Sequence, residues 1–201
     1  MKNLKAITRS HHRVAGVDEA GRGPLAGPVV VAAVMLPASH SLAGLDDSKR
    51  LSEKQRESLF PDIKEQALSW SVVIVDVDEI EELNILRASL TGMQRAVKQL
   101  DPQPTLTLVD GNRAPELDGE VHTIIEGDHW VPAISAASIL AKVTRDAIMA
   151  RYHEQYPHYG FDHNKGYPTP EHLKLLKEHG PCPIHRKTFA PVREVLEPSL
   201  F

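Results

Sequence analysis

Apolar residues fall into short runs that predict five β-strands. The longest is the uninterrupted run 29–36, which lies between Pro28 and Pro37 and is rich in the β-branched residues that favour strands. The first run begins at Val14, and the remaining three cover 70–77, 105–109 and 120–125. Because only a short loop separates the first two runs, we expect them to pair as an antiparallel hairpin.

Between and after these runs, apolar residues recur every three or four positions, which is the spacing of a helix. A capping box at 52–55 predicts a helix start, and we expect that helix to break or restart near Pro61. Further helices are predicted from Asp78 to about Leu100, from about Ala133 to Arg151, and from Thr169-Pro170 onward. This order predicts a mixed α/β domain whose helices cover a sheet.

Composition narrows the class of protein without indicating a function. The 201 residues are 41% hydrophobic and 25% charged, as expected of one globular domain. No apolar run is long enough to span a membrane, and the first residues lack the apolar core of a signal peptide. A single cysteine, Cys182, excludes an internal disulfide, so we expect a reducing compartment, the cytoplasm. The net charge of −4 is evidence against a broad basic surface, but allows a local basic groove or bound metal ions.

Acidic residues follow three of the predicted strands: Asp18-Glu19, Asp110 and Asp128. If those strand ends meet, the four carboxylates would repel one another unless a cation lies between them. Carboxylate oxygens suit Mg²⁺ or Mn²⁺, whereas Zn²⁺ favours His and Cys. The alternative is that each acidic residue is a solvated turn former, and Asp110-Gly111 is a common turn dipeptide. Spacing alone leaves both interpretations open.

Several longer motifs, in order, closely resemble type 2 ribonuclease H, the bacterial ribonuclease HII family. The most specific is Gly16-Val17-Asp18-Glu19-Ala20-Gly21-Arg22-Gly23-Pro24. The resemblance extends over about residues 13–195, and its other motifs are 47–49, 109–111, 127–128, 134–146, 163–169 and 183–186.

This resemblance implies an RNase H-like α/β fold. We expect a five-stranded mixed sheet flanked by helices in a single catalytic domain, 1–201, with a C-terminal helical extension from about residue 152. It also implies an endonuclease that cuts the RNA strand of RNA/DNA hybrids, including 5′ of single ribonucleotides embedded in duplex DNA. Water would attack the phosphorus, leaving 3′-hydroxyl and 5′-phosphate ends.

The resemblance also assigns roles to individual residues. Two divalent ions, Mn²⁺ or Mg²⁺, would be bound by Asp18, Glu19, Asp110 and Asp128, with Asp18 shared by both ions. The backbone of Gly21-Arg22-Gly23 and the hydroxyl of Tyr167 would detect the 2′-hydroxyl that distinguishes RNA from DNA. From the residues alone, Tyr167 is better explained as a turn residue packed before Pro168.

Further substrate contacts are expected on the helix from Ala133, whose polar residues follow helical spacing. The candidates for contacting the substrate are Lys49, Ser138, Lys142, Arg145, His185 and Arg186. The alternative for the helix is a solvated face with an internal Arg145–Asp146 pair.

Two other functions remain to be weighed. A nucleotidase or kinase using the glycine turn is disfavoured because the phosphate-binding sequence Gly-x-x-x-x-Gly-Lys-[Ser/Thr] is absent. The second is a noncatalytic module that binds RNA/DNA hybrids. We expect a monomer, and the tail 198–201 faintly resembles a sliding-clamp-binding peptide, although the glutamine of such peptides is missing.

Overall fold

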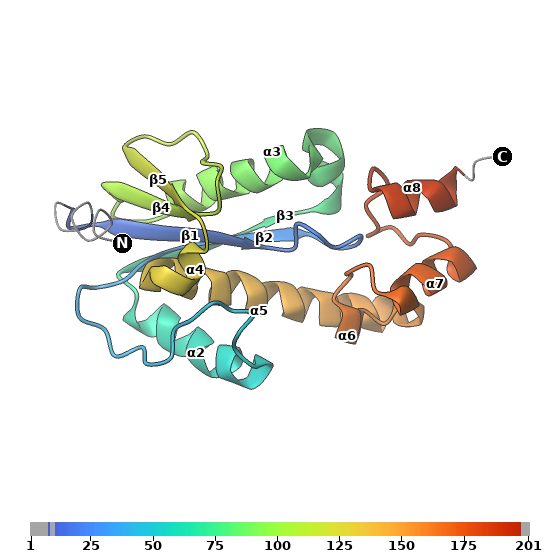
Figure 1. Ribbon diagram of the computed structural model, residues 1–201, viewed down its shortest axis with the longest axis horizontal. Coiled ribbons are helices and arrows are strands. Elements are labelled where there is room, and N and C mark those ends of the chain that lie inside the picture. Colours follow the sequence, from blue (N-terminus) through green and yellow to red (C-terminus); the bar gives the residue numbers. More distant parts are fainter. Residues whose placement is uncertain (1–7, 9–10, 198–201) are drawn as a thin grey trace.

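A five-stranded mixed sheet forms the centre of the computed structural model, which describes residue 8 and residues 11–197 (Figure 1). The spatial order of the strands is β3-β2-β1-β4-β5. The antiparallel hairpin is confirmed: β1 pairs with β2, and β2 pairs antiparallel with β3. β4 lies parallel to β1, and β5 lies parallel to β4. The strand bounds are Val14–Ala20 (β1), Val29–Met35 (β2), Ser69–Val75 (β3), Leu106–Asp110 (β4) and Glu120–Ile124 (β5).

Helices cover both faces of this sheet, as the sequence predicted. Helix α3 (Val77–Lys98) lies on one face, while α2 (Glu53–Gln66) and α5 (Pro132–Gln155) lie on the other (Figure 1). Every residue of β2 is buried. A strand covered on both faces needs apolar residues on both, which explains the uninterrupted run at this position.

Close packing of α5 on β1 requires the glycine at position 16. A Cβ atom at Gly16 would lie 2.2 Å from the carbonyl carbon of Ala133, on the first turn of α5. The two backbones therefore approach more closely than any side chain would permit. This approach brings the middle of α5 over the end of β1.

The C-terminal helices lie together at one end of the molecule, beyond the sheet (Figure 1). They are the 3₁₀ helix η1 (Pro157–Tyr159), α6 (Phe161–Asn164), α7 (Pro170–His179) and α8 (Ala190–Leu196). An apolar cluster joins η1, α6 and the segment after α7 to α5 and to the loop after β1, and contains Ala26, Met149, Tyr159, Phe161, Cys182 and Ile184. The predicted cap of α7 is confirmed, because the Thr169 hydroxyl accepts a hydrogen bond from the His172 amide.

Three predicted boundaries were wrong. Helix α2 continues through Pro61 without a break. Two residues later, its buried Ile63 packs in the apolar cluster between the sheet and α5. The third strand ends at Val75, because the Asp76 side chain caps α3 and so starts that helix earlier than expected. Helix α5 extends to Gln155, beyond the expected end at Arg151. Among the described residues, none of the helices is both long and apolar enough to cross a membrane.

Candidate active site

The register of two parallel strands sets Asp18 beside Asp110. Val17 of β1 pairs with Val109 of β4, so the aspartates at the next positions are neighbours. Side chains alternate along a strand. Val17 faces the α3 side of the sheet, so Asp18 faces the α5 side, where it is only 5% exposed.

Asp128 reaches the same point from helix α4 (Gly127–Trp130). The expectation that it ends a strand was wrong: β5 stops at Ile124, and Glu126 turns the chain with a left-handed φ of 54° before α4 begins. Two hydrogen bonds hold this helix in place. The Gly127 amide donates to Asp110 Oδ1 over 2.7 Å, and the Ser135 hydroxyl donates to the Asp128 carbonyl over 2.6 Å.

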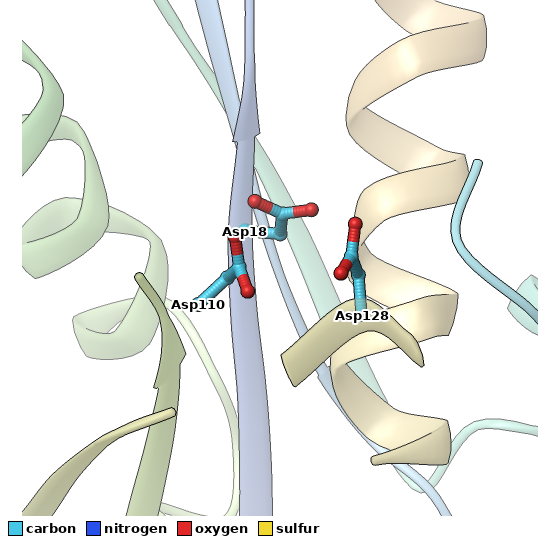
Figure 2. Close-up of side chains that lie close together, drawn as sticks. All are labelled: Asp18, Asp110 and Asp128. Carbon is cyan, nitrogen blue, oxygen red and sulfur yellow. The ribbon is translucent and has the colours of Figure 1, made fainter. Parts of the chain in front are cut away.

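The three aspartates form a compact cluster. One carboxylate oxygen from each of Asp18, Asp110 and Asp128 lies within 4.8 Å of the others. Figure 2 shows these side chains pointing toward one another, from β1, the end of β4 and α4, beside α5. The ends of two strands and a short helix, far apart in the sequence, therefore meet at one point.

Glu19 lies next to this cluster but not within it. As the neighbour of Asp18 on β1, it projects from the opposite side of the strand. Its carboxylate binds the Arg22 guanidinium at 3.3 Å, and its amide donates to Asp18 Oδ1 over 2.7 Å. The predicted set of four carboxylates is thus three close aspartates with a glutamate beside them.

Burial and the charges of neighbouring carboxylates raise the pKa values of Asp18, Glu19 and Asp128. Burial, and then the charges of Glu19 and Asp110, raise the pKa of Asp18 well above its usual range. Burial raises the pKa of Glu19 to about 7, against the opposing effect of Arg22. Burial, Asp110 and Asp47 raise the pKa of Asp128 to about 6.

These shifts and the donor atoms fit a divalent metal. Among the described residues, the one ion pair to these three aspartates is that of Lys49, whose Nζ lies 3.9 Å from Asp128. A bound cation would favour the ionised carboxylates that burial disfavours. A set made only of carboxylate oxygens suits Mg²⁺ or Mn²⁺ better than Zn²⁺.

Two adjoining pockets open beside the aspartates, and Lys49 lines both. The first, of about 200 Å³, is lined by Asp18, Glu19, Ala20, Gly21, Arg22, Gly23, Ser48, Lys49, Ser138, Lys142 and Tyr167. The second, of about 360 Å³, is lined by Asp47, Lys49, Arg50, Asp110, Glu126, Asp128 and His129. Most of the residues expected to contact the substrate therefore surround one pocket.

The glycine turn and Tyr167 meet in the first pocket, although they are far apart in the sequence. A Cβ atom at Gly23 would lie 3.7 Å from a ring carbon of Tyr167, so the ring and the turn are in contact distance. Tyr167 is 42% exposed. This exposure leaves the Tyr167 side chain accessible from the pocket.

Two polar residues of α5 are already engaged within the protein. The Ser138 and Ser48 hydroxyls share a hydrogen bond of 2.8 Å. Lys142 donates to Asp146 over 2.6 Å, and burial lowers the pKa of this lysine. Both residues still line the first pocket.

The expectation that Arg145, His185 and Arg186 contact the substrate does not fit their burial. Each is at most 1% exposed. The two arginines donate to backbone carbonyls, and the His185 ring lies between His172 and Cys182. The alternative Arg145–Asp146 pair is also absent from the described contacts of this helix, because Asp146 pairs with Lys142 and Arg56.

Sequence reasoning missed several residues around the second pocket. Arg50 Nη1 lies 2.7 Å from His129 Nδ1, and both contact Asp46. Asp47 was part of a recognised motif, but only Lys49, two residues later, was assigned a role. The position of His129, directly after Asp128, was the one available signal.

Known proteins are similar to this chain over almost its whole length. Residues 15–192 match the family model described as Ribonuclease HII. The chain is 59% identical over 180 residues to a Bordetella pertussis protein named Ribonuclease HII, covering 90% of each. The crystal structure of ribonuclease H2 from Pyrococcus horikoshii OT3 is similar with a TM-score of 0.78 and 29% identity, covering 91% of this chain and 96% of that one. RNase HII in its PCNA complex from Archaeoglobus fulgidus gives a TM-score of 0.65 and 29% identity, covering 83% and 87%.

The structural likeness confirms the RNase H-like fold, and the sequence likeness spans both halves of the site, from Asp18 to Tyr167. The chain belongs to the ribonuclease HII family.

Proposed function

We propose that the aspartate cluster hydrolyses the RNA strand of RNA/DNA hybrids and also cuts 5′ of ribonucleotides embedded in duplex DNA. Family membership makes the chain an endoribonuclease that acts on RNA/DNA hybrids. The observation that carries the mechanism is the convergence of oxygens from Asp18, Asp110 and Asp128 within 4.8 Å.

Asp18, Asp110 and Asp128 would hold two divalent ions, either Mn²⁺ or Mg²⁺, with Glu19 completing the site. Once bound, such ions activate a water molecule and stabilise the leaving oxygen of a phosphodiester. The protein's own contribution is to fix the ligands. The Glu19 and Gly127 amides hold the carboxylates of Asp18 and Asp110, and the low exposure of the cluster limits competing water.

The products would carry 3′-hydroxyl and 5′-phosphate ends. The single cysteine, Cys182, is buried among apolar residues that include Ala26 and Phe161, and it does not belong to the aspartate cluster. A direct attack by water is therefore favoured over a covalent intermediate on a thiol.

Recognition of the ribose would come from the first pocket. The 2′-hydroxyl is the group that marks a ribonucleotide within DNA, and it both donates and accepts hydrogen bonds. The Gly21-Arg22-Gly23 turn and Tyr167 line one pocket with Asp18 and Glu19, and their amides and hydroxyl are the groups that would bind the 2′-hydroxyl. Sensor and cutting site are thus close enough to act on one nucleotide.

Phosphate contacts would come chiefly from Lys49. Its side chain is 80% exposed and lines both pockets. Lys142 and Ser138, which line the first pocket from α5, would contribute as well. A few contacts of this kind are consistent with a chain whose net charge is −4.

Three further points belong to the proposal. The relative from Archaeoglobus fulgidus was solved as a complex with PCNA, and we propose an analogous contact here through the tail 198–201, which lies outside the described residues. We also propose that the enzyme is monomeric, with a single catalytic domain, and works in the cytoplasm.

The direct test is to incubate the protein with duplex DNA containing one ribonucleotide, in Mg²⁺ and separately in Mn²⁺. We expect incision on the 5′ side of the ribonucleotide in at least one metal. A folded protein that binds the hybrid without cleaving it in either metal would instead be a noncatalytic binding module.

A further inference from the structure

Arg186 is a fully buried cation whose hydrogen bonds all go to the backbone of the loop that follows β1. Its exposed fraction is 0%. Nη2 donates to the Gly21 carbonyl over 2.6 Å and to the Gly27 carbonyl over 2.8 Å, Nη1 donates to the Arg22 carbonyl over 3.0 Å, and Nε donates to the Gly27 carbonyl over 3.0 Å. In the part of the chain that is described, it makes no ion pair with a carboxylate.

Burying an unpaired charge is costly, so these bonds need an explanation beyond filling space. The cost is visible in the pKa of Arg186, which burial lowers to about 9. The planar guanidinium fork presents several donors in fixed directions, which suits it to bind several carbonyls at once.

Two of the three bonded carbonyls, those of Gly21 and Arg22, belong to the peptide units that carry the Arg22 and Gly23 amides. The Gly21 carbonyl shares a planar peptide unit with the Arg22 amide, and the Arg22 carbonyl shares one with the Gly23 amide. In a trans unit the N–H and C=O groups point in opposite directions. Drawing both carbonyls inward to Arg186 therefore turns both amides away from the core.

Arg22 and Gly23, the residues that carry these amides, line the pocket that also contains Asp18 and Tyr167. Within residues 11–197, neither the Arg22 amide nor the Gly23 amide donates a hydrogen bond to another protein group. They are thus free to bind an oxygen in the pocket.

We infer that Arg186 is the positioning residue of the ribose sensor: it fixes the Gly21-Arg22-Gly23 turn so that the Arg22 and Gly23 amides face the 2′-hydroxyl. This inference rests on the proposed function of the turn. Arg186 itself touches neither the substrate nor the metal ligands, so its effect is on discrimination between ribose and deoxyribose.

Arg186→Lys is the informative substitution, because lysine keeps the positive charge but cannot span three carbonyls in fixed directions. The readout is the ratio of dissociation constants for two duplexes, one all-DNA and one with a single ribonucleotide, measured in Ca²⁺ in place of Mg²⁺ or Mn²⁺. We expect the wild type to prefer the ribonucleotide and R186K to lose about tenfold of that preference, the effect of losing one or two hydrogen bonds.

Two controls separate positioning from general damage. Met93→Ala removes a buried side chain from the cluster beneath α3 and should lower the melting temperature without changing the ratio. Arg193→Lys repeats the same chemical change at an exposed position of α8 and should change neither quantity. Partial unfolding alone reduces binding to both duplexes equally and leaves the ratio intact.

A second measurement needs no substitution and applies even if R186K fails to fold. Hydrogen exchange of the Arg22 and Gly23 amides in the wild type should slow with the ribonucleotide duplex more than with the all-DNA duplex. Equal exchange with both duplexes, or an unchanged dissociation ratio in folded R186K, would overturn the inference. A wild type that cleaves no ribonucleotide substrate would count against the proposed function instead.

Discussion

Asp110 and Gly127 join the end of a strand to the start of a helix through one hydrogen bond of 2.7 Å. The Gly127 amide donates to the Asp110 carboxylate, and the next residue along the chain is Asp128. Two of the three clustered aspartates are therefore fixed relative to each other by the protein. The cluster behaves as one unit, so a change at any member affects the whole.

Replacing Asp18 by Asn should abolish cleavage while leaving the fold intact. The amide removes one charged ligand from the centre of the cluster, and we expect a loss of at least about 10³-fold in kcat, the upper range for losing one preorganised group. The measurement is single-turnover cleavage of an RNA/DNA hybrid. Asp118→Asn, at an exposed position of the loop before β5, is the matched control and should keep full activity. Activity of D18N within tenfold of the wild type would remove Asp18 from the mechanism.

Without metal, the carboxylate cluster should destabilise the protein as the pH rises. The folded pKa values of Glu19 and Asp128, about 7 and about 6, lie above the usual values of such groups. The folded state therefore binds more protons than the unfolded state, so this contribution to stability is present at low pH and is lost as the pH rises toward 7.

The check is thermal unfolding of the wild type and D18N in EDTA at pH 5 and pH 8. Because Asn cannot ionise, D18N should gain stability relative to the wild type at the higher pH, and adding Mn²⁺ or Mg²⁺ should raise the melting temperature of the wild type alone. A difference between the two proteins that does not change with pH would contradict the repulsion argument.

Tyr167→Phe should weaken cleavage at a single embedded ribonucleotide. The ring that lies beside Gly23 is retained, and only the hydroxyl is lost, so we expect a decrease of about tenfold in kcat/KM. The comparison is with Tyr156→Phe, which removes a hydroxyl at the end of α5. Equal rates for Y167F and the wild type would argue against the hydroxyl as part of the sensor.

Gly16→Ala should lower stability because α5 has no room to move away from β1. The added methyl group would overlap the Ala133 backbone, which is 2.2 Å from the Cβ position. Overpacking of this kind should lower the melting temperature by about 4 to 10 °C. Gly23→Ala is the control for stability, since its nearest neighbour would be at an ordinary 3.7 Å. Equal melting temperatures for G16A and the wild type would show that α5 adjusts freely.

Local patterns in the sequence predicted the strands and the main helices well. The run at 29–36 and the cap at Thr169 depend on residues close together in the chain, so both were found within a residue or so of their observed positions. The position of Asp128 was less accessible, because it depends on the left-handed turn at Glu126, which no residue preference indicated.

The roles of the basic residues could not be predicted from the sequence. Arg145 and Arg186 carry charged side chains, and such side chains usually face solvent. The carbonyls that they bind include those of Ala26, Gly27 and Pro28, which are more than a hundred residues away in the sequence. Only folding brings these groups together. The two arginines, expected to bind phosphates, instead bind backbone carbonyls inside the protein.

Lys49 is the basic residue that remains best placed to meet the substrate, and Lys49→Ala should weaken binding through charge. Its exposed ammonium group lies 3.9 Å from Asp128, at the boundary between the two pockets. Removing one phosphate contact should raise KM and reduce the slope of log affinity against log salt concentration by about one. The measurement is hybrid binding across a salt series in Ca²⁺. Lys54→Ala, an exposed lysine on α2, is the matched control and should leave the slope unchanged. If both variants show the wild-type slope, Lys49 makes no phosphate contact, and its role is confined to balancing the aspartates.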